Sequence, residues 1–342
     1  MPAPVPVLDV RGLTVDIGRG RAAVRPVEDV SLRIEAGQTL GLVGESGSGK
    51  TMTGMSIMRL LPSGGRIVAG QVLVGGVDVT RLGRAAMRRV RGGDVAAVYQ
   101  DPMTTLNPTM TIGGQIVEAL RAHRRVSRRE ALERAADALG RVGIASPRER
   151  LGSYPFELSG GLRQRVVIAM ALVCEPRLLI ADEPTTALDV TIQAQLLDLV
   201  DDLRRALSLA VLLITHDMGV VAGRADRVAV MYAGRIVEED DAVSIFARHR
   251  HPYTEALLAS IPRPGQDKRT PLLTLPGLPP DLTAMPAGCR FSPRCAYVDA
   301  ECAATEPGLR EAPGDAGHRF ACHHPVGNHV AAAEPATTGS TA

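Results

Sequence analysis

The sequence predicts an α/β protein with a parallel core sheet and an inserted helical lobe. A short apolar run over 40–43 leads directly into a glycine-rich loop and then into a helical segment. Two further apolar runs, 178–181 and 211–215, are typical of buried strands, and a helix-forming segment over 190–207 separates them. Strands that alternate with helices pair in parallel, because each helix carries the chain back to the same end of the sheet.

Two more kinds of element surround this core. Residues 7–34 alternate apolar and polar side chains, which predicts half-buried strands at an antiparallel edge, and 66–79 predict a further hairpin there. Helical periodicity dominates over 112–142 and again over 163–173. We therefore expect the helical lobe at about 101–175.

Composition disfavours several classes of protein. Of 342 residues, 45% are hydrophobic, which is enough for a packed core. The net charge is only +2 and aromatic residues make up 3%, so no nucleic-acid partner is indicated. The apolar run over 166–174 is shorter than the roughly 20 residues that cross a bilayer. No secretory signal is visible at the N-terminus, so we expect a cytoplasmic chain that reaches a membrane only through other subunits.

The glycine-rich loop matches the pattern G-x-x-x-x-G-K-[ST] of a phosphate-binding loop (P-loop). Glycines let backbone N–H groups face an anion, and the following helix presents its positive end. In this motif Lys50 contacts the β- and γ-phosphates and the Thr51 hydroxyl binds Mg²⁺. A strand before the loop and a helix after it favour this interpretation over a flexible glycine loop. The loop residues are Gly44, Glu45, Ser46, Gly47, Ser48, Gly49, Lys50 and Thr51.

The apolar run over 178–181 ends in two carboxylates, Asp182 and Glu183. In P-loop enzymes an aspartate at the end of such a strand holds Mg²⁺. A carboxylate one residue further can polarise the water that attacks the γ-phosphate. Alone, the pair could equally be an exposed loop; the phosphate loop upstream favours catalysis. We therefore expect ATP and Mg²⁺ as the ligands.

Residues 158–165 read Leu-Ser-Gly-Gly-Leu-Arg-Gln-Arg. A turn formed by Ser159, Gly160 and Gly161 at the start of a helix is a second anion site, with a hydroxyl and free N–H groups. One ATP needs only one phosphate loop, so a second anion site predicts a composite pocket. This element resembles the signature of the ABC transporter ATPase family.

The resemblance covers about residues 7–260 and implies roles for three more residues. Gln100 would be the Q-loop glutamine near Mg²⁺ and the catalytic water, Asp189 the D-loop aspartate, and His216 the switch histidine. By itself His216 would be better interpreted as an ordinary surface histidine, but it follows a buried-type strand behind the other motifs. Around residues 17–19 the chain lacks the aromatic residue that usually stacks on adenine in this family.

The family forms head-to-tail dimers in which the phosphate loop of one subunit and the Ser159–Gly161 turn of the other enclose each ATP. The resemblance therefore implies a P-loop NTPase fold of the ABC nucleotide-binding type and an ATP hydrolase that acts as a translocase. A soluble ABC ATPase acting on nucleic acid or ribosomes is the alternative class. Such proteins usually carry tandem nucleotide domains or a coiled-coil insertion, and neither is present.

Three segments look like the peptide (oligopeptide, dipeptide, nickel) permease branch: residues 101–116, the run His-Pro-Tyr-Thr at 251–254, and the cysteine-bearing tail. This resemblance implies an importer of di- or oligopeptides or a similar solute, which an extracellular solute-binding protein supplies. Its partners would be two transmembrane permease subunits and a second ABC ATPase, in a heterodimer more often than a homodimer. The chain would then lie at the cytoplasmic face of the membrane. A nickel or other-solute importer and a drug exporter remain alternatives.

The tail contains four cysteines: Cys289, Cys295, Cys302 and Cys322. Four thiolates can bind Zn²⁺ or an iron–sulfur cluster, although the C-x₂₋₄-C pairs that zinc sites favour are absent. Cysteines that bind no metal, as free thiols or as disulfides, are the alternatives. Related permease ATPases have a similar tail, and some are thought to hold a [4Fe–4S] cluster, which is what the resemblance implies here. We expect Arg290, Arg294 and Arg319 to offset the negative charge of the thiolates.

These observations divide the chain into three parts. Residues 1–260 would form the ABC ATP-binding domain, which includes the helical lobe. Residues 261–330 would form a small C-terminal extension, with a proline-rich arm followed by the four cysteines. Residues 331–342 would be a disordered tail.

Overall fold

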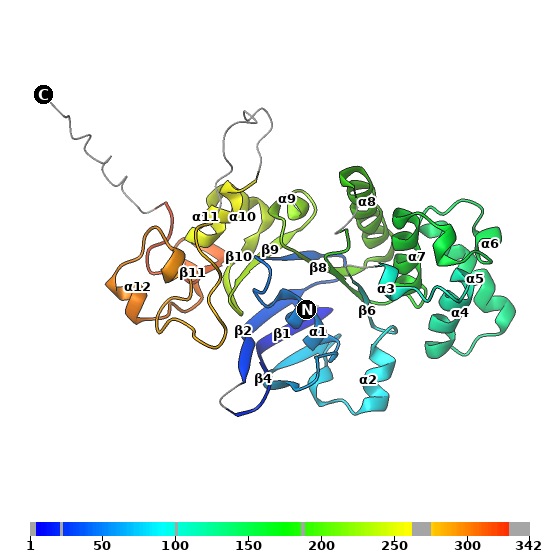
Figure 1. Ribbon diagram of the computed structural model, residues 1–342, viewed down its shortest axis with the longest axis horizontal. Coiled ribbons are helices and arrows are strands. Elements are labelled where there is room, and N and C mark those ends of the chain that lie inside the picture. The colour runs from blue at the N-terminus through cyan, green and yellow to red at the C-terminus, as the bar shows by residue number, and fades with distance from the viewer. Residues whose placement is uncertain (1–4, 21–22, 100–101, 186–188, 262–274, 328–342) are drawn as a thin grey trace, which may run out of the picture.

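The computed structural model describes residues 5–20, 23–99, 102–185, 189–261 and 275–327. Within these ranges the strands form two sheets (Figure 1). The central sheet has eight strands in the order β11-β12-β10-β9-β3-β8-β7-β6, and a second sheet has four in the order β2-β1-β4-β5. Gln100, the predicted Q-loop residue, and residues 262–274 of the proline-rich arm lie outside the described residues.

The middle of the central sheet is parallel. Strand β3 pairs in parallel with β8 and β9, and β7 pairs in parallel with β6 and β8. Every residue of β3, β7 and β8 is buried, because runs of Val, Leu and Ile suit strands that are covered on both faces. The predicted α/β class is confirmed. The strands of this sheet are β3 (Thr39–Val43), β6 (Val95–Val98), β7 (Leu178–Asp182), β8 (Ala210–Thr215), β9 (Arg227–Tyr232), β10 (Arg235–Asp241), β11 (Arg310–Ala312) and β12 (Asp315–Phe320).

The predicted antiparallel edge is also confirmed, as the second sheet. Strand β1 pairs antiparallel with both β2 and β4. Its apolar side chains form one core with Leu40 and Leu42 of β3, which fixes this sheet against the phosphate-loop strand. The strands are β1 (Leu8–Ile17), β2 (Val24–Ile34), β4 (Gly65–Val74) and β5 (Val77–Asp78).

Helices α3 to α7 gather at one side of the central sheet as a helical lobe (Figure 1). None of the described helices combines the length and apolarity that crossing a membrane requires. The helices are α1 (Lys50–Ile57), α2 (Arg84–Val90), α3 (Pro102–Thr105), α4 (Ile112–His123), α5 (Arg128–Arg141), α6 (Pro147–Arg150), α7 (Gly160–Leu172), α8 (Val190–Leu207), α9 (Met218–Val221), α10 (Ala242–Arg248), α11 (Pro252–Ala259) and α12 (Ala300–Ala304).

The C-terminal extension continues the central sheet. Strand β12 pairs antiparallel with β10, which belongs to the ATP-binding part of the chain. Phe291 is buried, and its ring centroid lies 5.3 Å from that of Tyr232 and 5.4 Å from that of Tyr253. An extension with few large apolar residues thus gains a core by packing on its neighbour. Strands β9 to β12 were not predicted from the sequence.

Candidate nucleotide-binding site

The phosphate loop joins β3 to α1 and is closely packed. Gly49 has a φ of 108°, and a Cβ atom there would lie 2.3 Å from the carbonyl oxygen of Pro26, so only glycine fits. Lys50 begins α1 and is 5% exposed. Its ammonium donates to the carbonyl oxygens of Gly44 at 2.7 Å and Glu45 at 2.8 Å. The cationic end of Lys50 is therefore held inside the curve of the loop.

Thr51 and Asp182 meet at the loop. The Thr51 hydroxyl lies 3.2 Å from Asp182 Oδ1, at the carboxyl end of β7. Burial raises the pKa of the Asp182 carboxyl, and the Thr51 hydrogen bond opposes that shift. Burial also lowers the pKa of Lys50, which the charges of Glu183 and Asp182 oppose. Bound Mg²⁺ would favour the ionised carboxylate.

Glu183 and His216 come from neighbouring parallel strands, β7 and β8, whose carboxyl ends share one edge of the sheet. Glu183 Oε1 lies 2.9 Å from His216 Nδ1. Glu183 has a φ of 47°, a strained conformation for a residue with a side chain, and its N–H donates to the carbonyl of Ile214 at 2.9 Å. The strained backbone turns the carboxylate toward the histidine.

The signature turn lies in the helical lobe. Ser159 caps α7 by accepting from the N–H of Leu162, and both Ser159 and Gly160 are exposed. Asp189 caps α8 by accepting from the N–H of Ile192 at 2.9 Å. Figure 1 shows α7 apart from α1. The structure therefore brings together the phosphate loop, Asp182, Glu183 and His216, whereas the Ser159–Gly161 turn belongs to a separate surface.

Gln164, for which the sequence indicated no role, links α7 to the segment that follows β7. It is 1% exposed, and its amide nitrogen donates to the carbonyl of Pro184 at 2.6 Å. Pro184 directly follows Glu183. A shift of α7 would therefore move the backbone one residue from Glu183.

The C-terminal extension contacts the phosphate loop. Arg294 forms two ion-pair hydrogen bonds with Glu45, Nη1–Oε2 at 2.6 Å and Nη2–Oε1 at 3.0 Å. The N–H of Glu45 donates to the hydroxyl of Tyr253, in the His-Pro-Tyr-Thr run, at 2.8 Å. The backbone N–H and the side-chain carboxylate of Glu45 are thus both bound by the C-terminal part of the chain. Neither contact was predicted.

The expected role of the three arginines near the cysteines is wrong, because each guanidinium pairs with a carboxylate instead. Arg294 pairs with Glu45. Arg290 pairs with Glu28 and with Glu306. Arg319 pairs with Glu239. Sequence proximity to a cysteine did not indicate where these long side chains would reach.

The four cysteines line one pocket, together with His251 and Phe291. Burial raises the pKa of all four thiols, and that of Cys322 to about 12. Stable thiolates there would need a bound cation. A tetrahedral zinc with Zn–S of about 2.3 Å puts its sulfurs about 3.8 Å apart. Among the described residues, only one of the four cysteines belongs to a group of three possible metal ligands whose atoms lie within 4.8 Å of one another. That cysteine is Cys302, grouped with Asp299 and His324.

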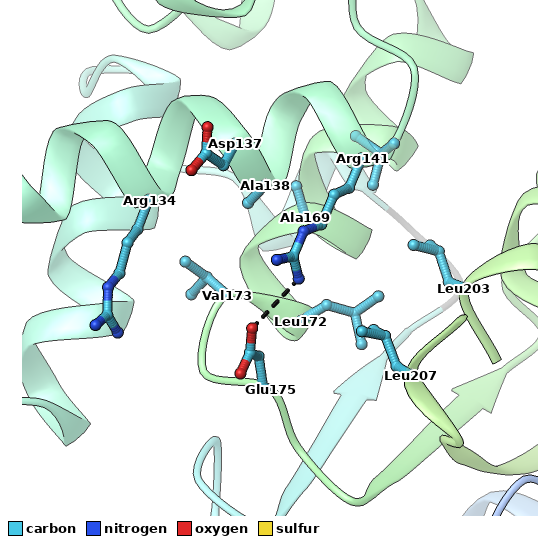
Figure 2. A pocket seen from close by; sticks show the side chains of 11 residues that line it. Arg134, Asp137, Ala138, Arg141, Ala169, Leu172, Val173, Glu175, Leu203 and Leu207 are labelled. Atoms are coloured by element: carbon cyan, nitrogen blue, oxygen red, sulfur yellow. Dashed lines mark hydrogen bonds and ion pairs between the residues drawn. The ribbon is translucent and has the colours of Figure 1, made fainter. Parts of the chain in front are cut away.

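A further pocket lies where α5, α7 and α8 meet (Figure 2). Its rim carries an ion pair between Arg141 and Glu175, with Nη1 and Oε1 3.3 Å apart. Its wall includes Leu172 and Leu207. No predicted site residue lines it, so it is separate from the phosphate loop.

Comparisons with known proteins agree with this geometry. Residues 27–186 match the family model described as ABC transporter, and 237–302 match the model described as oligopeptide/dipeptide transporter, C-terminal region. A Brucella melitensis protein provisionally named a peptide import ATP-binding protein is 52% identical over 316 residues, covering 89% of this chain and 93% of that protein. The dipeptide transport ATP-binding protein DppD of Escherichia coli is 45% identical over 320 residues, covering 94% and 97%. The dimeric structure of MJ0796, a bacterial ABC transporter cassette, has a TM-score of 0.61 and 25% identity, covering 69% of this chain and 98% of that one.

The fold and the phosphate-loop site define an ABC transporter ATPase, an enzyme that couples ATP hydrolysis to transport. Within that class, the chain belongs to the ATP-binding proteins of the peptide/dipeptide transporter family.

Proposed function

We propose that Glu183 is the general base for ATP hydrolysis in this ATPase subunit of a peptide or dipeptide import system. The observation that carries the proposal is the 2.9 Å contact between Glu183 Oε1 and His216 Nδ1 at the catalytic edge. A carboxylate in this position can accept a proton from the water that attacks the γ-phosphorus. The imidazole of His216 would hold that carboxylate in one orientation.

Lys50, Thr51 and Asp182 would hold the nucleotide and its metal. Mg²⁺ bridges the β- and γ-phosphate oxygens and stabilises the charge that develops during transfer. The 3.2 Å separation between the Thr51 hydroxyl and Asp182 supports a shared ion, since adjacent ligands of an octahedral Mg²⁺ lie about 3 Å apart. The N–H groups of Gly44 to Gly49 would surround the phosphates, and Gln100 would contact the Mg²⁺–water site.

The site would be completed by a second ATPase subunit. The exposed Ser159–Gly161 turn of one subunit would close over the γ-phosphate bound to the other, and Asp189 would lie at the same interface. Exposure of Ser159 and Gly160 on a lobe apart from the phosphate loop supports this arrangement. Closure would exclude water and assemble the catalytic residues only when ATP is bound.

The complete transporter would contain two transmembrane permease subunits and a pair of ABC ATPases at the cytoplasmic face. A heterodimer of ATPases is the favoured pairing. An extracellular solute-binding protein would deliver the peptide. Residues 1–260 would act as the ATPase domain and 261–330 as an extension that packs on it.

The four cysteines of the extension would hold a [4Fe–4S] cluster with a structural role. Their convergence on one pocket supports a shared group. Among the described residues no three of the four cysteines form a set of ligand atoms within 4.8 Å of one another, which is closer to the needs of a cluster than to those of a single zinc ion. The alternative is zinc, with His324 joining Cys302 as a ligand. Either group would stabilise the thiolate forms that burial disfavours.

Transport by the reconstituted complex tests the proposed function. The chain is purified with its permease and ATPase partners and placed in proteoliposomes, with ATP on the ATPase side and binding protein on the other. We expect ATP-dependent uptake of labelled dipeptide, and its loss when Lys50→Ala replaces this chain. Hydrolysis that accompanies uptake of Ni²⁺ but of no peptide would contradict a peptide substrate.

A further inference from the structure

A buried group of two carboxylates and a histidine joins the ATPase core to the C-terminal extension. Asp240 lies on β10, and Asp315 and His318 lie on β12. His318 Nδ1 is 3.2 Å from Asp240 Oδ2 and 3.7 Å from Asp315 Oδ2. One ligand atom from each residue lies within 4.8 Å of the other two. The side chain of His318 is 0% exposed and that of Asp240 is 8% exposed.

The three converging atoms are buried and form no hydrogen bond, although ion-pair contacts of 3.2 and 3.7 Å join them to one another. They are Asp240 Oδ2, Asp315 Oδ2 and His318 Nδ1. Buried polar side-chain atoms in proteins are nearly always hydrogen-bonded, or they bind an ion or an ordered water. Three such atoms aimed at one point therefore indicate a ligand, which a cluster of acidic residues alone would not.

The other ring nitrogen of His318 prepares Nδ1 for a metal. Nε2 lies 2.7 Å from Oε1 of Glu238, which is fully buried and also accepts from the backbone N–H groups of Arg250 and His251. Although burial opposes the shift, the carboxylates of Glu238, Asp240 and Asp315 raise the pKa of His318. A metal ion would therefore displace a proton from Nδ1, while Nε2–H continues to donate to Glu238. A histidine that binds a metal usually donates its second N–H to a carboxylate in this way.

We propose that Asp240, Asp315 and His318 bind one divalent transition-metal ion of the zinc type. Ligand atoms about 2.0–2.2 Å from a tetrahedral ion lie about 3.4 Å apart, close to the two measured separations of 3.2 and 3.7 Å. An imidazole ligand favours Zn²⁺ over Mg²⁺ and Ca²⁺, which prefer oxygen ligands. Two ligating carboxylates neutralise the ion, and water takes the fourth position.

The neighbouring arginines do not already neutralise the carboxylates of Asp240 and Asp315. Arg248 Nη1 lies 3.3 Å from Asp315 Oδ2, but its side chain is 56% exposed and can turn toward solvent. Arg227 and Arg319 pair with Glu239, the neighbour of Asp240, and satisfy a different carboxylate. The ion would join β10 to β12, whose pairing extends over Glu238–Phe320 and Glu239–Arg319. It would therefore fasten the extension to the ATPase sheet.

Cobalt(II) distinguishes this site from the four-cysteine pocket. The full chain is stripped of metal and titrated with Co²⁺, then with competing Zn²⁺. We expect one equivalent of Co²⁺ with weak ligand-field absorption that Zn²⁺ displaces. Any thiolate-to-cobalt charge transfer would come from the four-cysteine pocket, and it should disappear in Cys302→Ser. The ligand-field absorption persists in Cys302→Ser. The affinity for Co²⁺ falls at least tenfold in His318→Gln and in Asp240→Asn. It is unchanged in the control Asp202→Asn, which alters an exposed aspartate of α8.

Thermal unfolding provides the second readout, because a ligand of the folded state alone raises Tm. We expect Zn²⁺ to raise the Tm of Cys302→Ser by several degrees and not to raise that of Cys302→Ser with Asp315→Asn. The proposal is overturned if His318→Gln folds and binds Co²⁺ like the parent. It is also overturned if all absorption carries thiolate charge transfer, or if ¹⁵N NMR shows a doubly protonated His318 that Zn²⁺ leaves unchanged.

Discussion

Arg294, in the C-terminal extension, forms a bidentate ion pair with Glu45, the second residue of the phosphate loop, at 2.6 and 3.0 Å. The Arg294 side chain is 3% exposed and that of Glu45 is 27% exposed. Charge-assisted pairs of this geometry fix the direction of both side chains. The phosphate loop is thus held from outside by a segment that lies 249 residues further along the chain.

Removing this pair should loosen the loop. We expect Arg294→Gln to lower the free energy of unfolding by about 1–3 kcal/mol, because the carboxylate of Glu45 loses its partner. ATP binding should weaken as well. Urea unfolding and fluorescent-ATP titration measure the two effects, with Arg148→Gln, an exposed arginine of α6, as the matched control. A double-mutant cycle with Glu45→Gln should be non-additive; additive losses would show that the pair does not act as a unit.

Ser159→Arg should abolish ATP hydrolysis by the assembled complex while ATP still binds to the isolated chain. A large cation at the start of α7 would block closure over the phosphates bound to the partner subunit. Equilibrium binding to the single chain and steady-state ATPase of the complex are compared directly. If binding to the single chain fell as steeply as activity, the turn would belong to the same subunit's site.

The stability of the fold should decrease as pH falls from about 6.5 to about 4 because of His251. Burial lowers the pKa of His251 from 6.5 to about 4, and its Nδ1 accepts from the N–H of Tyr253. In that window the unfolded chain binds a proton that the folded chain does not, so folding loses up to about 3 kcal/mol. Above pH 6.5 the loss disappears.

The matched variant for this effect is His251→Asn, which keeps a helix-capping side chain without an ionisable group. Urea unfolding of both proteins at several pH values shows how the free energy of unfolding of each protein depends on pH. We expect the difference between the two proteins to be confined to pH 4–6.5. Parallel stability curves for the two proteins would exclude His251 as the source.

Anaerobic purification should yield about four iron and four sulfide per chain with broad visible absorbance, if the four cysteines bind a [4Fe–4S] cluster. Cys302→Ser should lose the absorbance and lower the Tm of the extension. A colourless protein whose zinc is lost in Cys302→Ser would show that the cysteines bind zinc in place of a cluster. Four thiols that alkylate freely in the folded protein would remove the metal site altogether.

The sequence could predict that Asp182, Glu183 and His216 lie near the phosphate loop, because each of them directly follows or ends a strand of the parallel sheet. A phosphate loop lies between a strand and a helix, and Asp182 and Glu183 end a run of apolar residues. Parallel strands then bring their ends together without further information. The contact between Glu183 and His216 follows from that pairing.

The C-terminal contacts could not be predicted in the same way. Strand β10 carries four consecutive acidic residues, Glu238 to Asp241, and the first three are buried, so its composition conceals a buried strand. Their partners become apparent only once β9 and β12 are placed on either side of β10, because Arg227 lies on β9 and both His318 and Arg319 lie on β12. Long arginine side chains reach partners that no local pattern indicates, as Arg294 and Glu45 demonstrate.

Glu183→Gln tests the central claim most directly. The amide keeps the size of the side chain and its contact with His216, but it cannot accept the proton of the attacking water. We expect the purified complex to bind ATP and dimerise while its hydrolysis rate falls about 10²–10⁴-fold, a barrier increase of roughly 3–5 kcal/mol. Hydrolysis at a rate near that of the wild type, with ATP binding intact, would contradict the assignment of Glu183 as the base.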